Sequence, residues 1–172
     1  MVIFLIILLL LISGCATLPE EFQGIYLEKK IGFSEVLESP EKYKDINVLW
    51  GGKIVKCLNK EDVTFLEIIQ FPLDLEGKPK IDSISEGRFQ VETPKFLDCA
   101  IYSPGRLITI FGSFKGLKEG KIGEKFYNFP FIEGKIFHLW REELRVHVEI
   151  PSPPCYWHPW WEPWWYHPWC CP

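Results

Sequence analysis

The chain has 172 residues, of which 24% are charged, and its formal net charge is −4. This balance argues against general nucleic-acid binding, because the lysines are scattered among acidic residues instead of forming a basic surface. The length is sufficient for one domain with a packed core and additional terminal segments.

An apolar run at residues 2–12 ends in Ser13-Gly14-Cys15. Eleven helical residues extend about 16 Å, whereas the bilayer core is about 30 Å thick, so the run fits an export signal better than a membrane span. Small residues before a cysteine are typical of the site that bacterial lipoprotein signal peptidase cleaves. We therefore predict a signal peptide at 1–14, cleavage between Gly14 and Cys15, and lipidation of Cys15. A secretory signal with a chance cysteine is the alternative, and the usual basic residue before the run is missing.

The predicted lipid on Cys15 is a diacylglycerol on the thiol and an acyl chain on the new amine. Two or more chains hold a protein firmly at a membrane, whereas one binds marginally. Ala16 follows the cysteine, and the absence of aspartate there favours the outer membrane over the inner one. Residues 15–30 are expected to be the lipidated N-terminus and a spacer, and no other cofactor is expected.

Residues 31–150 are predicted to form one mainly β domain. A short helix is expected within 34–43, with Ser34 as its N-cap and Pro40 interrupting it. Runs rich in β-branched and aromatic residues, separated by turn signals, predict strands at 46–58, 63–73, 87–93, 106–114 and 126–140, with a further candidate strand at 143–150.

Gly51-Gly52 lies inside the first of these strands. Glycine in a strand usually marks a bulge or the sharp bend of a barrel corner. Five or six strands with such a kink predict a small, bent, OB-like β-barrel, and a β-sandwich is the competing architecture. Cys57 and Cys99 also lie in this domain. The periplasm permits disulfides, but the sequence leaves open whether the two cysteines pair.

Several segments occur in an order and spacing that together are fairly specific: the lipobox, 51–55 (GGKIV), 64–74 (TFLEIIQFPLD), 96–98 (FLD), 108–112 (ITIFG), 120–132 (GKIGEKFYNFPFI) and 138–140 (HLW). In these segments the chain resembles the Slp family of Gram-negative outer-membrane lipoproteins. The resemblance implies an anchored domain on the periplasmic side and an association with starvation and stationary phase. It implies no catalytic residues. Cys99 departs from the proline expected after 96–98.

Five carboxylates could support acid–base chemistry only if they met in a cleft: Glu67, Asp74, Glu86, Asp98 and Glu124. Glu67 is expected on a solvated face, and the two aspartates are expected to cap turns. Arg88 and Arg106 each follow a glycine and are expected to protect sheet edges, with anion binding as the alternative. Residues 116–124 (GLKEGKIGE) lack the spacing of a phosphate-binding loop and are expected to be a loop that leads into a strand. The sequence therefore does not support an enzyme.

Residues 151–172 are predicted to be an irregular tail, because its many prolines disfavour helix and strand. Tryptophan is typical of membrane–water interfaces. We therefore predict that the tail contacts such an interface through Trp157, Trp160, Trp161, Trp164, Trp165 and Trp169. Contact with an envelope protein, or packing over the barrel, are the alternatives.

The tail also contains the ligand set of a tetrahedral zinc site: Cys155, His158, His167 and Cys170. A chance pattern in a repetitive segment is the preferred interpretation, so no metal site is predicted.

The sequence thus predicts a non-enzymatic outer-membrane lipoprotein, with membrane lipid and an envelope protein as candidate partners. One alternative function is a ligand-binding module for an oligosaccharide, a peptide or a small anion. A second is a metal-binding tail. The oligomeric state is not indicated.

Overall fold

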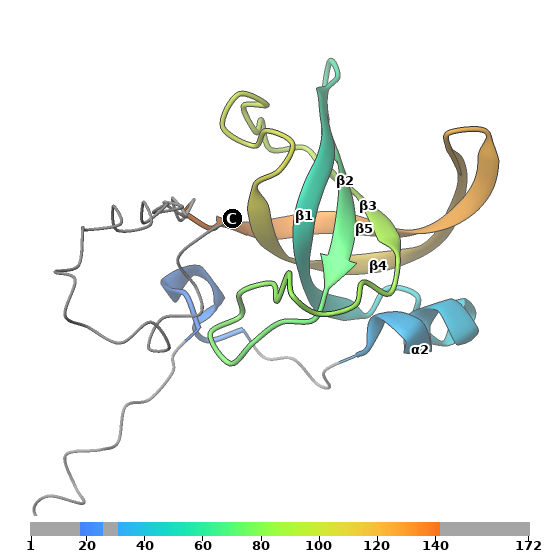
Figure 1. Cartoon of the computed structure of the whole chain (residues 1–172), viewed down its shortest axis with the longest axis horizontal. Helices are drawn as coiled ribbons and strands as arrows, with labels where there is room; N and C mark the ends of the chain where they lie inside the picture. Colours follow the sequence, from blue (N-terminus) through green and yellow to red (C-terminus); the bar gives the residue numbers. More distant parts are fainter. Residues whose placement is uncertain (1–17, 26–30, 142–172) are drawn as a thin grey trace, which may run out of the picture. The chain divides into compact units, whose positions relative to one another are not determined.

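The computed structural model describes residues 18–25 and 31–141. The chain divides into two compact units, Met1–Glu142 and Glu143–Pro172, and all described residues belong to the first. The candidate strand at 143–150 and the tail at 151–172 lie outside the described residues, as do residues 1–17. The described elements are η1 (Glu20–Phe22), α2 (Phe33–Glu38), η2 (Pro40–Tyr43), β1 (Asn47–Asn59), β2 (Thr64–Phe71), β3 (Arg88–Thr93), β4 (Leu107–Ile122) and β5 (Lys125–Leu139) (Figure 1).

The five strands form a closed barrel in the order β1-β2-β3-β5-β4. The β3–β5 pair is parallel, and every other pair is antiparallel. A five-stranded Greek-key barrel of this kind is the OB fold. The predicted OB-like barrel is therefore confirmed, and the sandwich is excluded for this part of the chain.

The barrel interior is filled by alternate side chains of its strands. Along β2, Leu66 and Ile68 are buried, whereas Glu67 between them points outward. This period of two is the reason that the apolar pattern located the strand correctly. The interior is a packed core rather than a channel, and its fully buried members include Ile54, Phe89, Val91, Ile108, Ile110, Phe114 and Ile132.

At Gly51-Gly52, where a bulge or a sharp bend was expected, the structure has no bulge. Both glycines pair in continuous register with Phe71 and Gln70 of β2, and the register shift in β1 falls between Ile54 and Lys56. A Cβ on Gly52 would lie 1.8 Å from the Ile69 carbonyl oxygen. Glycine is needed at this point because the backbone of the neighbouring strand β2 lies too close for a side chain.

The helix begins earlier than the sequence suggested. Gly32 occupies the N-cap of α2, so Ser34 lies within the first turn instead of capping it. The Ser34 N–H and hydroxyl both donate to Glu86 Oε2, at 3.0 and 2.8 Å. A carboxylate distant in sequence has therefore replaced the local cap. Pro40 does interrupt the helix, since η2 begins with it.

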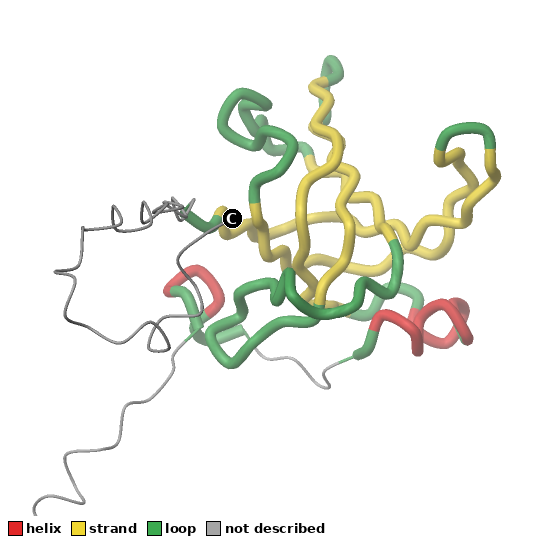
Figure 2. Tube along the Cα trace, in the orientation of Figure 1, coloured by secondary structure: helices red, strands yellow, loops and turns green. Residues whose placement is uncertain are grey.

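Residues 116–122 belong to β4, not to the loop predicted over 116–124. They pair with β5 from Gly116–Phe131 to Ile122–Lys125, and Gly123 turns the chain with a φ of 61°. This β4–β5 hairpin extends beyond the barrel (Figure 2). A polar, glycine-rich segment forms a strand here because β5 provides a continuous hydrogen-bonding partner.

Cys57 and Cys99 form a disulfide, with their Cα atoms 5.5 Å apart. The bond joins β1 to the β3–β4 connection. It answers the pairing question that the sequence left open.

Candidate functional site

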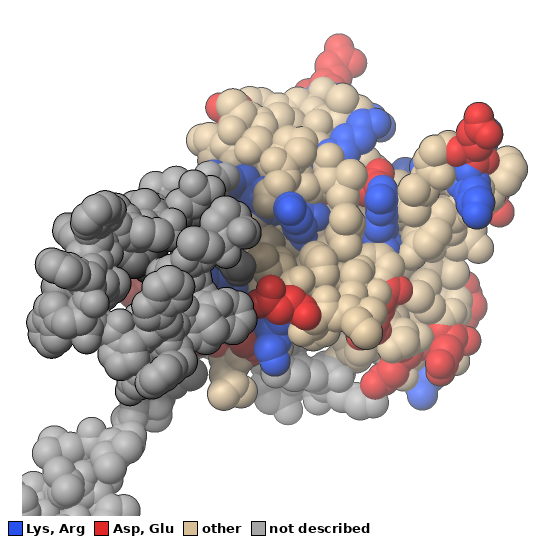
Figure 3. Space-filling model, viewed as in Figure 1, with Lys and Arg blue, Asp and Glu red and all other residues tan. Residues whose placement is uncertain are grey.

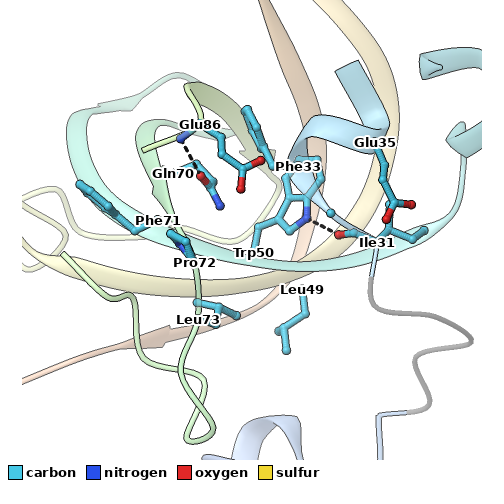
Figure 4. Close-up of a pocket in the computed structure, with 11 residues that line it drawn as sticks. Ile31, Phe33, Glu35, Leu49, Trp50, Gln70, Phe71, Pro72, Leu73 and Glu86 are labelled. Carbon is cyan, nitrogen blue, oxygen red and sulfur yellow. Dashed lines mark hydrogen bonds between the residues drawn. The ribbon is translucent and has the colours of Figure 1, made fainter. Parts of the chain in front are cut away.

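A pocket of about 290 Å³ opens beside the N-terminal end of α2 (Figure 4). β1, the end of β2 and both ends of the β2–β3 loop provide its other walls. Most of the lining residues have apolar side chains, and the polar side chains among them are those of Glu35, Gln70 and Glu86. This composition is typical of small-molecule sites.

Trp50 is the central aromatic residue of the pocket. It is buried, its indole Nε1 donates to the Ile31 carbonyl at 3.0 Å, and its ring meets Phe33 edge-on at a centroid distance of 5.0 Å. The hydrogen bond holds residue 31 against β1. Trp50 and Phe33 therefore form one wall of the pocket and also cover the barrel core.

The polar side of the pocket is built around Glu86. The buried Gln70 accepts the Glu86 N–H through Oε1 at 3.2 Å, and the Glu86 carboxylate accepts from Ser34. Glu35 accepts the Tyr43 hydroxyl at 3.1 Å. Two carboxylates on one pocket favour a ligand that offers hydrogen-bond donors, and they disfavour a small anion.

A second hollow of about 330 Å³ shares Glu86 with the first, and Ile69, Arg88, Ile122 and Tyr127 contribute to its lining. The Tyr127 hydroxyl accepts the backbone N–H of Arg88 at 3.1 Å. Glu86 therefore contributes to both hollows.

Of the five carboxylates considered from sequence, only Glu86 lines this pocket, so they do not meet in it. Glu67 faces outward and pairs with Arg88 at 2.8 Å. Asp74 Oδ1 accepts the N–H groups of Glu76 and Lys78, and Asp98 Oδ1 accepts that of Ala100, so both cap turns as predicted. Glu124 lies in the turn between β4 and β5.

The two arginines have partners within the domain. Arg88 pairs with Glu67, and Arg106 donates from Nη1 and Nη2 to the carbonyls of Ile101 and Trp140. Each arginine therefore joins neighbouring segments of the barrel. On the face shown in Figure 3, basic and acidic side chains are interspersed.

The residues predicted for lipidation, cleavage and membrane contact lie outside the described residues. These are Gly14, Cys15, Trp157, Trp160, Trp161, Trp164, Trp165 and Trp169. The cysteines and histidines of the tail, Cys155, His158, His167 and Cys170, lie there too. Within residues 18–25 and 31–141, no group of three or more His, Cys, Asp or Glu side chains is placed to hold a metal ion. No helix in the same described ranges is both long and apolar enough to cross a bilayer.

Sequence reasoning missed most of the pocket. Gln70 occupies an inward position in the alternation of β2, where a polar side chain is unusual, and this signal could have been found. The sequence around Trp50 gives no such signal, because a tryptophan next to two glycines is equally consistent with an ordinary core residue and with a pocket residue. Its role depends on segment 31–35 packing against β1.

The chain matches the sequence model of the "Outer membrane lipoprotein Slp family" over residues 12–170. It belongs to the Slp family. This confirms the resemblance seen in its motifs and makes the protein an Slp-family outer-membrane lipoprotein.

Among relatives, the chain is 31% identical over 145 residues to the "Uncharacterized lipoprotein YeaY" of Escherichia coli, covering 84% of this chain and 74% of that protein. It is 29% identical to the "Outer membrane protein Slp" of the same organism, covering 76% and 69%. Crystal structures of Rim1, a mitochondrial single-stranded DNA binding protein of S. cerevisiae, share 12% identity at a TM-score of 0.36 in one form. That match covers 56% of this chain and 96% of Rim1, and a similarity at this level supports no inference about ligands.

Proposed function

We propose that this protein is a non-enzymatic envelope lipoprotein whose barrel is held at the outer membrane by lipid on Cys15. The observation that carries the proposal is the reach of the family match. It begins at residue 12 and therefore includes Ser13-Gly14-Cys15 together with the barrel. The domain is proposed to lie on the periplasmic side, where a disulfide such as Cys57–Cys99 is maintained.

The anchoring is tested with Cys15→Ala, and Ser13→Ala is the matched control because it keeps a small residue before the cleavage site. Mass spectrometry of the N-terminal peptide should find a triacylated Cys15 in the parent and the control, and none in Cys15→Ala. In membrane fractionation, the Cys15→Ala protein should be missing from the outer-membrane fraction. An unmodified thiol in the parent would end the proposal.

The Trp-rich tail is proposed to add a second contact with the membrane interface. A tethered tail meets lipid at high effective concentration, so weak insertion of Trp157, Trp160, Trp161, Trp164, Trp165 and Trp169 would suffice. Vesicle flotation of residues 15–172 carrying Cys15→Ala tests this, because that protein has neither the lipid nor the apolar run at 2–12. Replacing the six tryptophans by serine should abolish flotation, and replacing them by phenylalanine should retain much of it. Equal flotation of the serine and phenylalanine variants would show that aromatic rings do not hold the tail at lipid and would remove this part of the proposal.

A role in starvation or envelope stress belongs to the same proposal and is supported by the family resemblance. A deletion strain should lose viability faster in stationary phase than the same strain carrying the gene. Unchanged survival under starvation and under envelope stress would remove this part.

The pocket beside Trp50 supports a second candidate function, a module that binds an oligosaccharide or a peptide. Its volume of about 290 Å³ and its apolar walls with two carboxylates favour such ligands over a small anion. Phe71→Ser, in the pocket wall, should weaken binding of an oligosaccharide or peptide panel measured by NMR titration. Phe65→Ser is the matched control, because Phe65 is on the same strand and face but not in the lining. No shifts at the pocket with any member of the panel would remove this candidate.

A further inference from the structure

The β2–β3 loop presents an exposed leucine at the tip of a well-formed turn. Leu75 is 81% exposed and occupies the second position of a turn closed by a hydrogen bond from the Gly77 N–H to the Asp74 carbonyl. Asp74 also holds the turn from within, since its Oδ1 accepts the N–H groups of Glu76 and Lys78. An apolar side chain is thus held in water by a turn whose backbone bonds are satisfied.

The turn is fastened to the barrel. The buried Thr109 hydroxyl donates to the Gly77 carbonyl at 2.6 Å and accepts from Trp140 Nε1 at 2.9 Å. At the base of the turn, the Lys80 N–H donates to the Pro72 carbonyl at 2.8 Å. The position of Leu75 relative to the barrel is therefore set by the fold.

Two more residues of the same loop expose apolar side chains: Ile81 is 42% exposed and Ile84 is 89% exposed. We call Leu75, Ile81 and Ile84 the apolar loop surface. The charges around it are mixed, because Lys78 and Lys80 are offset by Glu76 and Asp82. A partner surface for this loop must therefore be recognised mainly through apolar contact.

The β2–β3 loop lies beside the N-terminal segment, which leads back to the proposed anchor at Cys15. A Cβ on Gly77 would lie 2.9 Å from Leu18 Cδ2, so Leu18 adjoins the turn. After Leu18, the chain is held on β5, where Phe22 is buried and Glu21 bonds His138 at 3.1 Å. Cys15 precedes Leu18 by three residues, which can span at most about 10 Å.

We propose that the apolar loop surface docks on the lipid bilayer and seats the barrel against the membrane beside its anchor. The proposal rests on the proposed lipidation of Cys15. A lipid at Cys15 keeps Leu18 within about 10 Å of the bilayer, and the turn lies directly beside Leu18. The tether thus supplies a high effective concentration, and three exposed aliphatic side chains supply the contact.

The other end of the barrel provides the contrast. Ile101 is 54% exposed, but it lies near the Cys57–Cys99 disulfide, at the far end of β1 from Gly51 and the β2–β3 loop. The six residues from Gly51 to Cys57 extend about 20 Å along the strand. Ile101 is therefore expected to face water when the loop is seated.

The test uses the full-length lipoprotein, purified from membranes and reconstituted into phosphatidylcholine vesicles. The photo-cross-linking residue p-benzoylphenylalanine is placed at position 75 in one variant and at position 101 in its control. A variant carrying it at position 84 repeats the first measurement. After irradiation, mass spectrometry should find phospholipid adducts at 75 and 84 in at least tenfold excess over those at 101. Adding phosphatidylglycerol should change the yields less than twofold, since the contact is apolar.

Equal lipid yields at 75 and 101, or adducts at 75 with a second copy of the chain in place of lipid, would overturn the docking proposal. The acylation of Cys15 is read by mass in the same samples, which separates the two ideas. A triacylated Cys15 with equal yields removes the docking surface alone. A Cys15 without lipid removes the proposed anchor and the docking surface together.

Discussion

The two ends of the barrel are closed by different means. At the end that carries the β1–β2 hairpin, the Cys57–Cys99 disulfide ties the β3–β4 connection to β1. Hydrogen bonds support it, since Thr64 Oγ1 donates to Asn59 and accepts the Leu97 N–H. At the opposite end, the described residues have no covalent link. There α2 places the buried side chains of Phe33 and Val36 over the core.

The end of the barrel that is held covalently is thus different from the end that carries the candidate binding surfaces. The disulfide end can expose apolar side chains in short loops because its backbone is held covalently. The packed end brings together α2, β1, the β2–β3 loop and the N-terminal segment, and it contains both the pocket and the apolar loop surface. Its closure depends on side chains that also form the pocket wall, so the comparison can be tested by weakening one end at a time.

The largest effect is expected from Phe33→Ala. Phe33 is buried against Trp50 and Phe89, so its removal leaves a cavity and should lower the free energy of unfolding by about 3–5 kcal/mol. Urea denaturation followed by circular dichroism measures this loss. Phe96→Ala, at the exposed Phe96 near the disulfide end, is the control and should change stability by less than about 0.5 kcal/mol. Similar losses for both variants would mean that α2 does not close the barrel.

Removing the disulfide should have the next largest effect. The double change Cys57→Ala and Cys99→Ala opens a covalent loop with a sequence separation of 42 and should cost about 2–4 kcal/mol. Denaturation of the double variant beside the oxidised parent measures the loss. In the parent, a reductant should produce a similar loss, and in the double variant it should produce none. A double variant as stable as the parent would show that hydrogen bonding alone holds this end.

Thr109→Val should loosen the packed end without creating a cavity. The substitution leaves the Gly77 carbonyl and Trp140 Nε1 without the hydroxyl that joins them and should cost about 1–3 kcal/mol. Hydrogen exchange should rise in residues 74–78 and stay unchanged around Cys57. Leu75→Ser, on the exposed tip of the same turn, is the control and should leave stability within about 0.5 kcal/mol of the parent. Protection of the turn that survives in Thr109→Val would contradict its role as the fastening point.

The smallest effect concerns pH. A hydrogen bond from its own backbone N–H, followed by the hydrogen bond to His138, lowers the pKa of Glu21 from its ordinary value of 4.5, although burial opposes the shift. A lowered pKa adds stability that is present above pH 4.5 and is lost as the pH falls through the folded-state value. The Glu21 side chain is 51% exposed, so Glu21→Gln should cost less than about 1 kcal/mol at pH 7.

The parent and Glu21→Gln should therefore converge in stability as the pH falls below 4.5, measured as melting temperature against pH. Glu20→Gln, for the neighbouring acidic residue of η1, is the control. A Glu21→Gln difference that grows as the pH falls below 4.5 would have the wrong sign for this carboxylate.

The strands of the barrel were predictable from local pattern to within two residues at each end, with the C-terminal end of β4 as the exception. The alternation around Leu66 and Ile68 marks β2 because successive side chains of a strand point to opposite faces. The extension of β4 from 115 to 122 could not be predicted, since its polar and glycine-rich sequence needs β5 beside it. Ser34 illustrates the same limit, because its partner Glu86 is 52 residues away.

The candidate sites divide in a similar way. Asp74 and Asp98 were predicted as turn caps, because the hydrogen bonds of such caps reach only a few residues along the chain. The pocket beside Trp50 was not predicted, since its walls come from α2, two strands and a loop. The lipid on Cys15 and the membrane contacts of the tail stay predictions, because they concern residues outside the described part of the chain.

By itself, the sequence determined membership of the Slp family, the positions of five strands and the mainly β character of the domain. These depend on short motifs and on a period of two, both readable from neighbouring residues. Only the tertiary structure decided the pairing of Cys57 with Cys99, the need for glycine at position 52 and the closeness of Leu18 to the Leu75 turn. Each of these depends on two separate segments meeting in the folded domain, through the pairing of β1 with β2, the packing of the N-terminal segment on β5 and the folding of the β3–β4 connection against β1.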